Sequence, residues 1–99
     1  MYINEYGNRT KPLVVLLAPM LVSGSDLYKL MSPYFKGDYH IISPDQGGHG
    51  QAEAYINADE EYACLKKYLH DNGMNKIELV YGASLGVAVA YRLFLDPDF

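Results

Sequence analysis

The segment Gly82–Gly86, with the sequence GASLG, limits the possible folds of this chain more than any other stretch. It separates residues 77–81, which are rich in branched and aromatic side chains and predict a buried strand, from residues 86–95, an apolar run that predicts a buried helix. A strand that passes directly into a helix needs small residues on both sides of the turn, because the two elements come close together there. We therefore expect a strand, a sharp turn at Ser84 and a helix.

A turn of this kind is typical of a nucleophile elbow, in which the backbone of the central serine is strained and its hydroxyl stands free at the carboxyl end of the sheet. Ser84 is thus a candidate nucleophile, with Gly82 and Gly86 as the elbow residues. The backbone N–H of Leu85 would point at the same spot and could hold a developing oxyanion. Taken alone, the pattern G-x-S-x-G has low specificity, because Gly and Ser are common.

Strand and helix patterns alternate along the rest of the chain. We expect an edge strand at residues 2–6, a strand covered on both faces at 12–17 and a short strand at 40–43. One helix is expected after Ser25 as its cap, and a second at about 52–71. The apolar faces predicted for these two helices are Leu27, Leu30, Met31 and Tyr34 in the first, and Ala58, Tyr62, Leu65 and Leu69 in the second. This alternation predicts an α/β fold, a mostly parallel sheet with flanking helices in three αβα layers.

Length and charge exclude several classes of function. Ninety-nine residues predict a single domain, 1–99, and a net charge of −4 without a basic cluster argues against nucleic acid as a partner. The longest early apolar run, residues 13–22, contains Pro19 and is too short to cross a bilayer, so we expect no membrane association and a cytoplasmic location. Cys64 is the only cysteine, and we expect it to be a packing residue of a helix.

Metals and cofactors are not expected. No set of His, Cys, Asp and Glu has the spacing of metal ligands, and the acidic run 59–61 is most simply a solvated start of a helix. The glycine-rich loop at residues 47–50 is not followed by the Lys and Ser/Thr of a phosphate-binding loop.

Three motifs in order resemble the amino-terminal half of an α/β-hydrolase. They are the aliphatic run 13–17 with the loop to Ser23-Gly24, the loop 45–50 (DQGGHG) and the segment 79–86 (LVYGASLG). The resemblance extends from about residue 2 to residue 95. It implies a serine hydrolase that cleaves a carboxylic ester or thioester through an acyl-serine intermediate. It further implies that Ser84 is the nucleophile and that the N–H groups of Leu85 and Met20 form the oxyanion hole.

The remaining members of a catalytic triad are not apparent. In this family the acid and the histidine follow the serine, and none of the 15 residues after Ser84 is a histidine. Asp96 and Asp98 would lie at the far end of the last helix, about 18 Å from Ser84. We expect His40 and His70 at the opposite, amino edge of the sheet as solvent or rim residues.

His49 is expected at the carboxyl edge, and the resemblance implies a strand order that places its strand two strand spacings, or roughly 10 Å, from the elbow. In its Gly-His-Gly setting it more plausibly fixes the loop by hydrogen bonding than serves as a base. Asp45 is likewise expected to cap that loop. The acid and the histidine would then belong to a carboxyl-terminal half that these 99 residues do not contain.

Two hypotheses of different class follow. The first is a serine hydrolase that is incomplete as this chain. The second is a non-catalytic association module that retains the elbow. Residues 85–95 form a helix that is apolar on all sides, and the strand at 77–81 would be left at an uncovered sheet edge. We therefore expect a homo-oligomer or docking of a missing carboxyl-terminal half.

Overall fold

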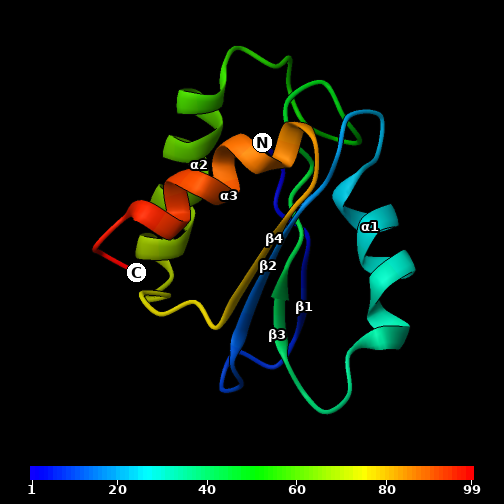
Figure 1. The fold of residues 1–99 in the computed structure, drawn as a ribbon, viewed down its shortest axis with the longest axis vertical. Helices are drawn as coiled ribbons and strands as arrows, with labels where there is room; N and C mark the ends of the chain where they lie inside the picture. Colours follow the sequence, from blue (N-terminus) through cyan, green and yellow to red (C-terminus); the bar gives the residue numbers. More distant parts are fainter.

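A computed structural model describes all 99 residues as one mixed sheet of four strands with helices on both faces (Figure 1). The strands are β1 (Glu5–Gly7), β2 (Leu13–Leu17), β3 (His40–Ile42) and β4 (Leu79–Gly82). The helices are α1 (Gly24–Met31), the short 3₁₀ helix η1 (Ser32–Tyr34), α2 (Ala58–Asp71) and α3 (Leu85–Leu95). None of these helices combines the length and the apolar character that crossing a membrane requires.

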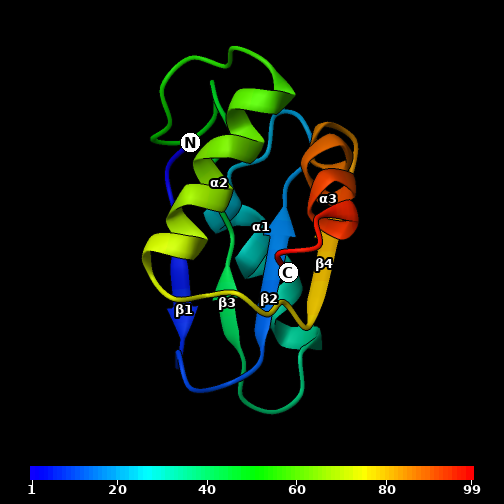
Figure 2. The ribbon, with the colours of Figure 1, turned by 90° about the vertical axis from the view of Figure 1, so that its left-hand side faces the viewer.

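The strands lie in the order β1-β3-β2-β4. Strand β2 pairs in parallel with β3 and with β4, whereas β1 pairs with β3 in the antiparallel direction. Helices α2 and α3 cover one face of the sheet and α1 covers the other (Figure 2). The predicted α/β fold in three layers is therefore confirmed, as is the edge position of β4. The edge strand expected at residues 2–6 is found at Glu5–Gly7, and its antiparallel direction was not predicted.

Strand β2 is the centre of the core because both of its faces are covered. All five of its residues are buried, and its side chains alternate between the two faces of the sheet. Leu13, Val15 and Leu17 pack with α2 and α3, whereas Val14 and Leu16 pack with Leu27 of α1 and Ile41 of β3. The unbroken aliphatic run follows from this position, since each side chain has an apolar layer to enter.

Helix α2 begins six residues later than the sequence pattern predicts. Asn57 is its cap, and the Asn57 side chain accepts a hydrogen bond of 2.8 Å from the Glu60 N–H, so residues 52–57 lie outside the helix. Leu65 and Leu69 are buried as predicted, but Cys64 is exposed, because it lies on the outer side of the helix. The prediction of Cys64 as a packing residue is wrong.

Helix α1 also differs from the prediction. Its cap is Ser23 rather than Ser25, and the Ser23 hydroxyl accepts a hydrogen bond of 3.1 Å from Asp26 N–H. Leu27 is buried as expected. Leu30 is exposed instead, because the stacking of Tyr28 on Tyr6, with ring centroids 3.6 Å apart, turns the inner face of the helix toward Tyr28. Tyr34 lies beyond α1, in η1, and is also exposed. Met31 is only half-buried.

Helix α3 has only one buried face within this chain. Gly86, Val89 and Leu93 are buried, while Val87, Tyr91 and Phe94 are half or more exposed. The other side of this apolar helix is uncovered within these 99 residues, because no layer lies on it (Figure 2), and the expectation that a second copy or a missing half covers it stays a prediction.

A polar cluster lies at the amino edge of the sheet, opposite the elbow. Glu5 accepts hydrogen bonds from Arg9 at 2.6 and 2.8 Å, from His40 at 2.6 Å and from Tyr68 at 2.7 Å. The hydrogen bonds from Arg9, with smaller contributions from Tyr68 and His40, outweigh desolvation and lower the pKa of Glu5 to about 2. His40 is buried within this cluster, so the prediction of a rim position for it is wrong.

The lowered pKa of Glu5 predicts a loss of stability in acid. Because the folded pKa of about 2 lies below the ordinary value of 4.5, the carboxylate stabilises the fold above pH 4.5, and this contribution is lost as the pH falls toward 2. Urea unfolding followed by circular dichroism across this range should show a steeper loss for the wild type than for Glu5→Gln. Glu53→Gln removes an exposed carboxylate and serves as the control. Equal slopes for wild type and Glu5→Gln would contradict the assignment.

Candidate functional site

Ser84 lies on a strained turn between β4 and α3. Its backbone has φ 51° and ψ −115°, a conformation that residues with a side chain seldom adopt. The side chain is exposed and makes no hydrogen bond within the protein. Such a geometry costs on the order of 1–3 kcal/mol and persists where the surrounding structure enforces it. The predicted strain at Ser84 is confirmed, and its hydroxyl is accessible.

The two glycines of the elbow are required by close approach of the backbone. A Cβ atom on Gly86 would lie 2.2 Å from the carbonyl oxygen of Leu17 at the end of β2. A Cβ atom on Gly82 would lie 2.7 Å from the Cβ of Ala90 in α3. These glycines let α3 start directly against the end of the sheet, and this contact fixes the turn at Ser84.

Leu85, the first residue of α3, supplies one candidate oxyanion donor. The first N–H groups of a helix have no partner inside the helix, and the helix dipole adds a partial positive charge there. The neighbouring Ala83 N–H donates to the Leu17 carbonyl at 3.2 Å, which anchors the elbow to β2. The serine hydroxyl and the Leu85 N–H thus stand at the same helix end.

Met20, the second candidate donor, lies in a tight turn after β2. The Val22 N–H donates to the Pro19 carbonyl at 3.2 Å, and Leu21 in between has φ 70°. A positive φ at the third position is a feature of type II turns, where Gly or Asn is usual. The N–H of Met20 donates to no group of the protein. This turn follows β2 and the elbow follows β4, and the carboxyl ends of these two strands are paired through Leu17 and Gly82.

His49 ties this turn to the glycine-rich loop. Its Nε2 accepts a hydrogen bond of 2.8 Å from the Leu21 N–H, and its Nδ1 donates to the Gly47 carbonyl at 3.0 Å. Both ring nitrogens are therefore engaged in loop hydrogen bonds. The prediction that His49 fixes the loop is confirmed, and β2 separates its strand β3 from β4 as expected.

Two buried carboxylates hold the same loop. Asp45 accepts from the Gly24 N–H at 2.7 Å, from the Gln51 N–H at 3.0 Å and from the Asn4 amide at 3.0 Å, which confirms its role as a capping carboxylate. Glu61 of α2 accepts from the Gly47 N–H and is buried. A solvated position for Glu61 is therefore wrong. Its place four residues before Leu65, on the same helix face, is the signal that indicates burial.

Gln46 is a further residue that sequence reasoning missed. Its side-chain amide donates to the Ala18 carbonyl at 2.6 Å, next to Met20, while its Oε1 is buried without a partner. Gln46 therefore links the loop after β3 to the turn after β2. A glutamine in a glycine-rich loop carries no sequence signal for such a contact.

The remaining polar candidates lie away from the elbow. Asp96 accepts hydrogen bonds from Tyr62 and, at 2.8 Å, from Lys66, both on α2, and Asp98 pairs with the same lysine at 3.0 Å. His70 is exposed near the end of α2, as predicted. No three or more His, Cys, Asp and Glu side chains gather in a way that could hold a metal ion.

The His49 contacts predict a measurable effect on the turn at Leu21. His49→Ala should lower the free energy of unfolding by about 1 kcal/mol and speed hydrogen exchange of the Leu21 amide, because that N–H loses its acceptor. Amide exchange followed by NMR gives the measurement. His70→Ala, which removes an exposed histidine, is the matched control. Unchanged exchange at Leu21 would show that His49 does not order this turn.

No protein-family model matches this sequence, and no curated protein matches it. Among solved structures, an α/β-hydrolase family protein from Desulfitobacterium hafniense superposes with a TM-score of 0.81 at 22% identity, over 92% of this chain and 37% of that chain. An esterase from Exiguobacterium antarcticum (EaEST) gives a TM-score of 0.76 at 17% identity, over 97% of this chain and 36% of that chain. Epoxide Hydrolase A from Mycobacterium thermoresistibile gives 0.72 at 26% identity, over 91% of this chain and 30% of that chain.

The chain thus spans only about a third of the length of these structures, while nearly all of its own length superposes on them. This chain has the α/β-hydrolase fold, of which it forms part of the core.

Proposed function

We propose that this chain carries the nucleophile and the oxyanion donors of a serine hydrolase that acts on a carboxylic ester or thioester. The observation that carries the proposal is the strained, exposed Ser84, placed directly before the first N–H groups of α3. A strained backbone at a free nucleophile is typical of functional sites. The similar structure described as an esterase agrees with this class of reaction.

In the proposed reaction the Ser84 hydroxyl oxygen attacks the carbonyl carbon of the substrate and its proton passes to a base. The carbonyl oxygen becomes an oxyanion that the N–H groups of Leu85 and Met20 stabilise. Collapse of this intermediate expels the alcohol or thiol and leaves an acyl-serine. Water then attacks the acyl-serine, releases the carboxylic acid and restores Ser84.

The base is not among the groups that surround the elbow. Both ring nitrogens of His49 are engaged with the loops, His40 lies in the cluster around Glu5, and His70 lies near the end of α2. The proposal therefore assigns to this chain the nucleophile and the oxyanion donors, and assigns the acid and the base to residues outside these 99. The alternative is a non-catalytic association module, which the exposed apolar side of α3 favours.

Reaction with a fluorophosphonate distinguishes the two functions. The proposal predicts that Ser84 is phosphonylated in preference to the four other serines, although slowly because no base activates it, since the N–H groups of Leu85 and Met20 stabilise the charge that develops on the phosphonyl oxygen. Peptide mass spectrometry of the treated chain locates the modification. Ser84→Ala should abolish it, and Ser25→Ala, which removes a half-buried serine of α1, should not. Absence of label, or label spread over all serines, would favour the association module.

Turnover is a separate prediction. The 99-residue chain and Ser84→Ala should hydrolyse p-nitrophenyl acetate at rates within about tenfold of each other, because a serine without a base is a weak nucleophile. Release of p-nitrophenol, followed by absorbance, measures both rates. A much larger difference would show that a base inside this chain acts on Ser84, and His49→Ala would then test the histidine in the loop after β3.

A further inference from the structure

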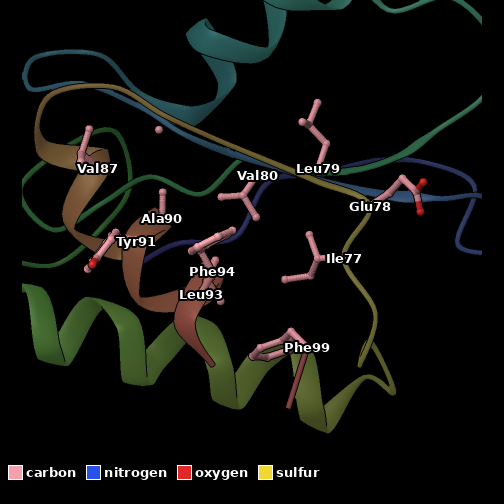
Figure 3. A pocket seen from close by; sticks show the side chains of 11 residues that line it. Ile77, Glu78, Leu79, Val80, Val87, Ala90, Tyr91, Leu93, Phe94 and Phe99 are labelled. Atoms are coloured by element: carbon pink, nitrogen blue, oxygen red, sulfur yellow. The ribbon is translucent and has the colours of Figure 1, made fainter. Parts of the chain in front are cut away.

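An apolar groove of about 590 Å³ lies between β4 and α3, along the free edge of the sheet (Figure 3). Val80 and Ala90 line it, whereas Ser84, Met20 and Gln46 do not. Nothing in the structure shows what covers the groove, and the proposed reaction does not use it. The contacts that bear on the oxyanion donors lie instead in the loops after β2 and β3.

Gln46, in the loop after β3, is only 2% exposed, yet one end of its side-chain amide is unused. The Nε2 group donates to the Ala18 carbonyl at 2.6 Å, and Oε1 is buried without a partner. A backbone carbonyl can only accept a hydrogen bond, so the amide cannot be turned to pair Oε1 instead. An apolar side chain would merely leave the Ala18 carbonyl unpaired in place of Oε1. Stability alone therefore gives little reason for a glutamine here.

The carbonyl that Gln46 holds belongs to the peptide unit that joins Ala18 to Pro19. A peptide unit is planar, so a hydrogen bond that restrains its carbonyl restrains the whole unit. The next backbone rotation is φ of Pro19, which the proline ring fixes at about −65°. Between the Ala18 carbonyl and the Met20 N–H, the only soft rotation left is ψ of Pro19.

The turn after β2 sets this remaining rotation. The Pro19 carbonyl accepts a hydrogen bond of 3.2 Å from the Val22 N–H. The same trans peptide unit carries the Met20 N–H on its opposite side, and this N–H donates to no group of the protein. The direction of the Met20 N–H thus depends on two hydrogen bonds, one on each side of the Pro19 ring.

We propose that Gln46 is a positioning residue that directs the Met20 N–H toward the oxyanion. This role rests on the proposed function, in which Met20 and Leu85 supply the two oxyanion donors. A donor that is fixed before the reaction stabilises the developing charge without a cost of reorganisation. Gln46 provides this restraint through Ala18 and Pro19, without touching the substrate.

The other parts of the site do not replace this restraint. The Leu85 N–H is fixed by the start of α3, whereas Met20 belongs to no helix or strand. His49 accepts a hydrogen bond from the Leu21 N–H, which belongs to the peptide unit after Met20. That contact supports the turn, but it does not set the direction of the Met20 N–H. Gln46 is the side chain that acts on the peptide unit before Pro19.

Gln46→Met tests this role, because it keeps the length of the side chain and removes both polar ends. It exchanges one buried unpaired acceptor for another, so urea unfolding should give nearly the wild-type midpoint. Gln51→Met makes the same change on an exposed side chain of the same loop and is the matched control. If Gln46→Met does not fold, Pro19→Ala decides the question, because it keeps Gln46 and frees the rotation φ.

Amide signals in NMR spectra separate positioning from folding. In Gln46→Met, hydrogen exchange of the Val22 amide should be at least about threefold faster, because the turn opens more often. After phosphonylation of Ser84, the Met20 signal should move downfield in the wild type and Gln51→Met, but clearly less in Gln46→Met. The Leu85 signal should move equally in all three. Phosphonylation of Gln46→Met should be at least about tenfold slower than that of the wild type, because one oxyanion donor is no longer held in place.

The outcomes distinguish this role from the proposed function. A wild-type chain that forms no Ser84 adduct contradicts the proposed function, and the role of Gln46 fails with it. An adduct in which the Met20 signal moves equally in Gln46→Met and Gln51→Met overturns the positioning role alone. Unchanged Val22 exchange in Gln46→Met overturns it as well, with or without an adduct.

Discussion

Gly86→Val should lower the free energy of unfolding by about 3 kcal/mol or more, the largest loss that we expect from a single substitution at the elbow. The new Cβ would lie 2.2 Å from the Leu17 carbonyl oxygen and 2.6 Å from its carbon, and these are backbone atoms of the central strand. They cannot move aside without breaking the pairing of β2. Helix α3 must therefore shift away from the sheet, and the turn at Ser84 would open with it. Urea unfolding followed by circular dichroism measures the loss.

Gly86→Ala tests the same close contact with the smallest side chain. Glycine to alanine inside a helix ordinarily stabilises by up to about 1 kcal/mol. At Gly86 we expect the opposite sign, since alanine already carries the clashing Cβ. Val87→Ala changes the next residue of α3, which is half exposed, and should have little effect. An unchanged or raised stability of Gly86→Ala would contradict the close approach of α3 to β2.

Ser84→Gly should raise the free energy of unfolding by up to about 2 kcal/mol, although it removes the candidate nucleophile. Glycine adopts φ 51° without the steric cost that serine has there. We expect the free energy gained by removing this strain to exceed the entropy cost of folding that glycine adds, because glycine is more flexible in the unfolded chain. Ser84→Ala keeps the Cβ and should change stability little. Comparing the two variants by urea unfolding isolates the backbone strain. If Ser84→Gly is no more stable than Ser84→Ala, then no strain is stored at this turn.

A stabilising substitution at Ser84 would have a functional meaning. Positions where a natural residue lowers stability are commonly those where the side chain or its geometry is needed for activity. The hydroxyl of Ser84 contributes no hydrogen bond to the fold. Stability alone therefore gives no reason to keep serine at this position.

The elbow and the sheet were predictable because their signals are local. The run at Leu13–Leu17 is apolar on both sides of a strand, which only a central strand of a covered sheet requires. The spacing of Gly82, Ser84 and Gly86 reflects the close contacts of α3 with β4 at Gly82 and with β2 at Gly86. Strand order followed from the resemblance to α/β-hydrolases, and the structure agrees with it.

The wrong predictions have a different cause, which is contact between residues that are far apart in the sequence. His40 was expected at the rim from its place at the start of a strand, but Glu5, 35 residues away, pairs with it and allows its burial. Leu30 was expected inside from its spacing, but the stacking of Tyr28 on Tyr6 sets the helix face. Glu61 is buried because the Gly47 N–H needs an acceptor. No local pattern contains these partners.

The candidate site was predictable only in part for the same reason. Ser84 and Leu85 follow from one short motif. The conformation of the turn at Met20 depends on hydrogen bonds with the side chains of Gln46 and His49, and these bonds form only in the folded chain. Their side chains hold the turn that contains Pro19 and Met20. The link between the two loops is thus a property of the tertiary structure.

The most direct test of this account is the amide proton chemical shift of Leu85 before and after phosphonylation of Ser84. The account predicts a clear downfield shift of the Leu85 signal, because a phosphonate oxygen on Ser84 would accept a hydrogen bond from the first N–H of α3. The Gly73 amide, which already donates to His70 at the end of α2, should not move and serves as the internal reference. A Ser84 adduct that leaves Leu85 unshifted would contradict the claim that nucleophile and oxyanion donor form one site.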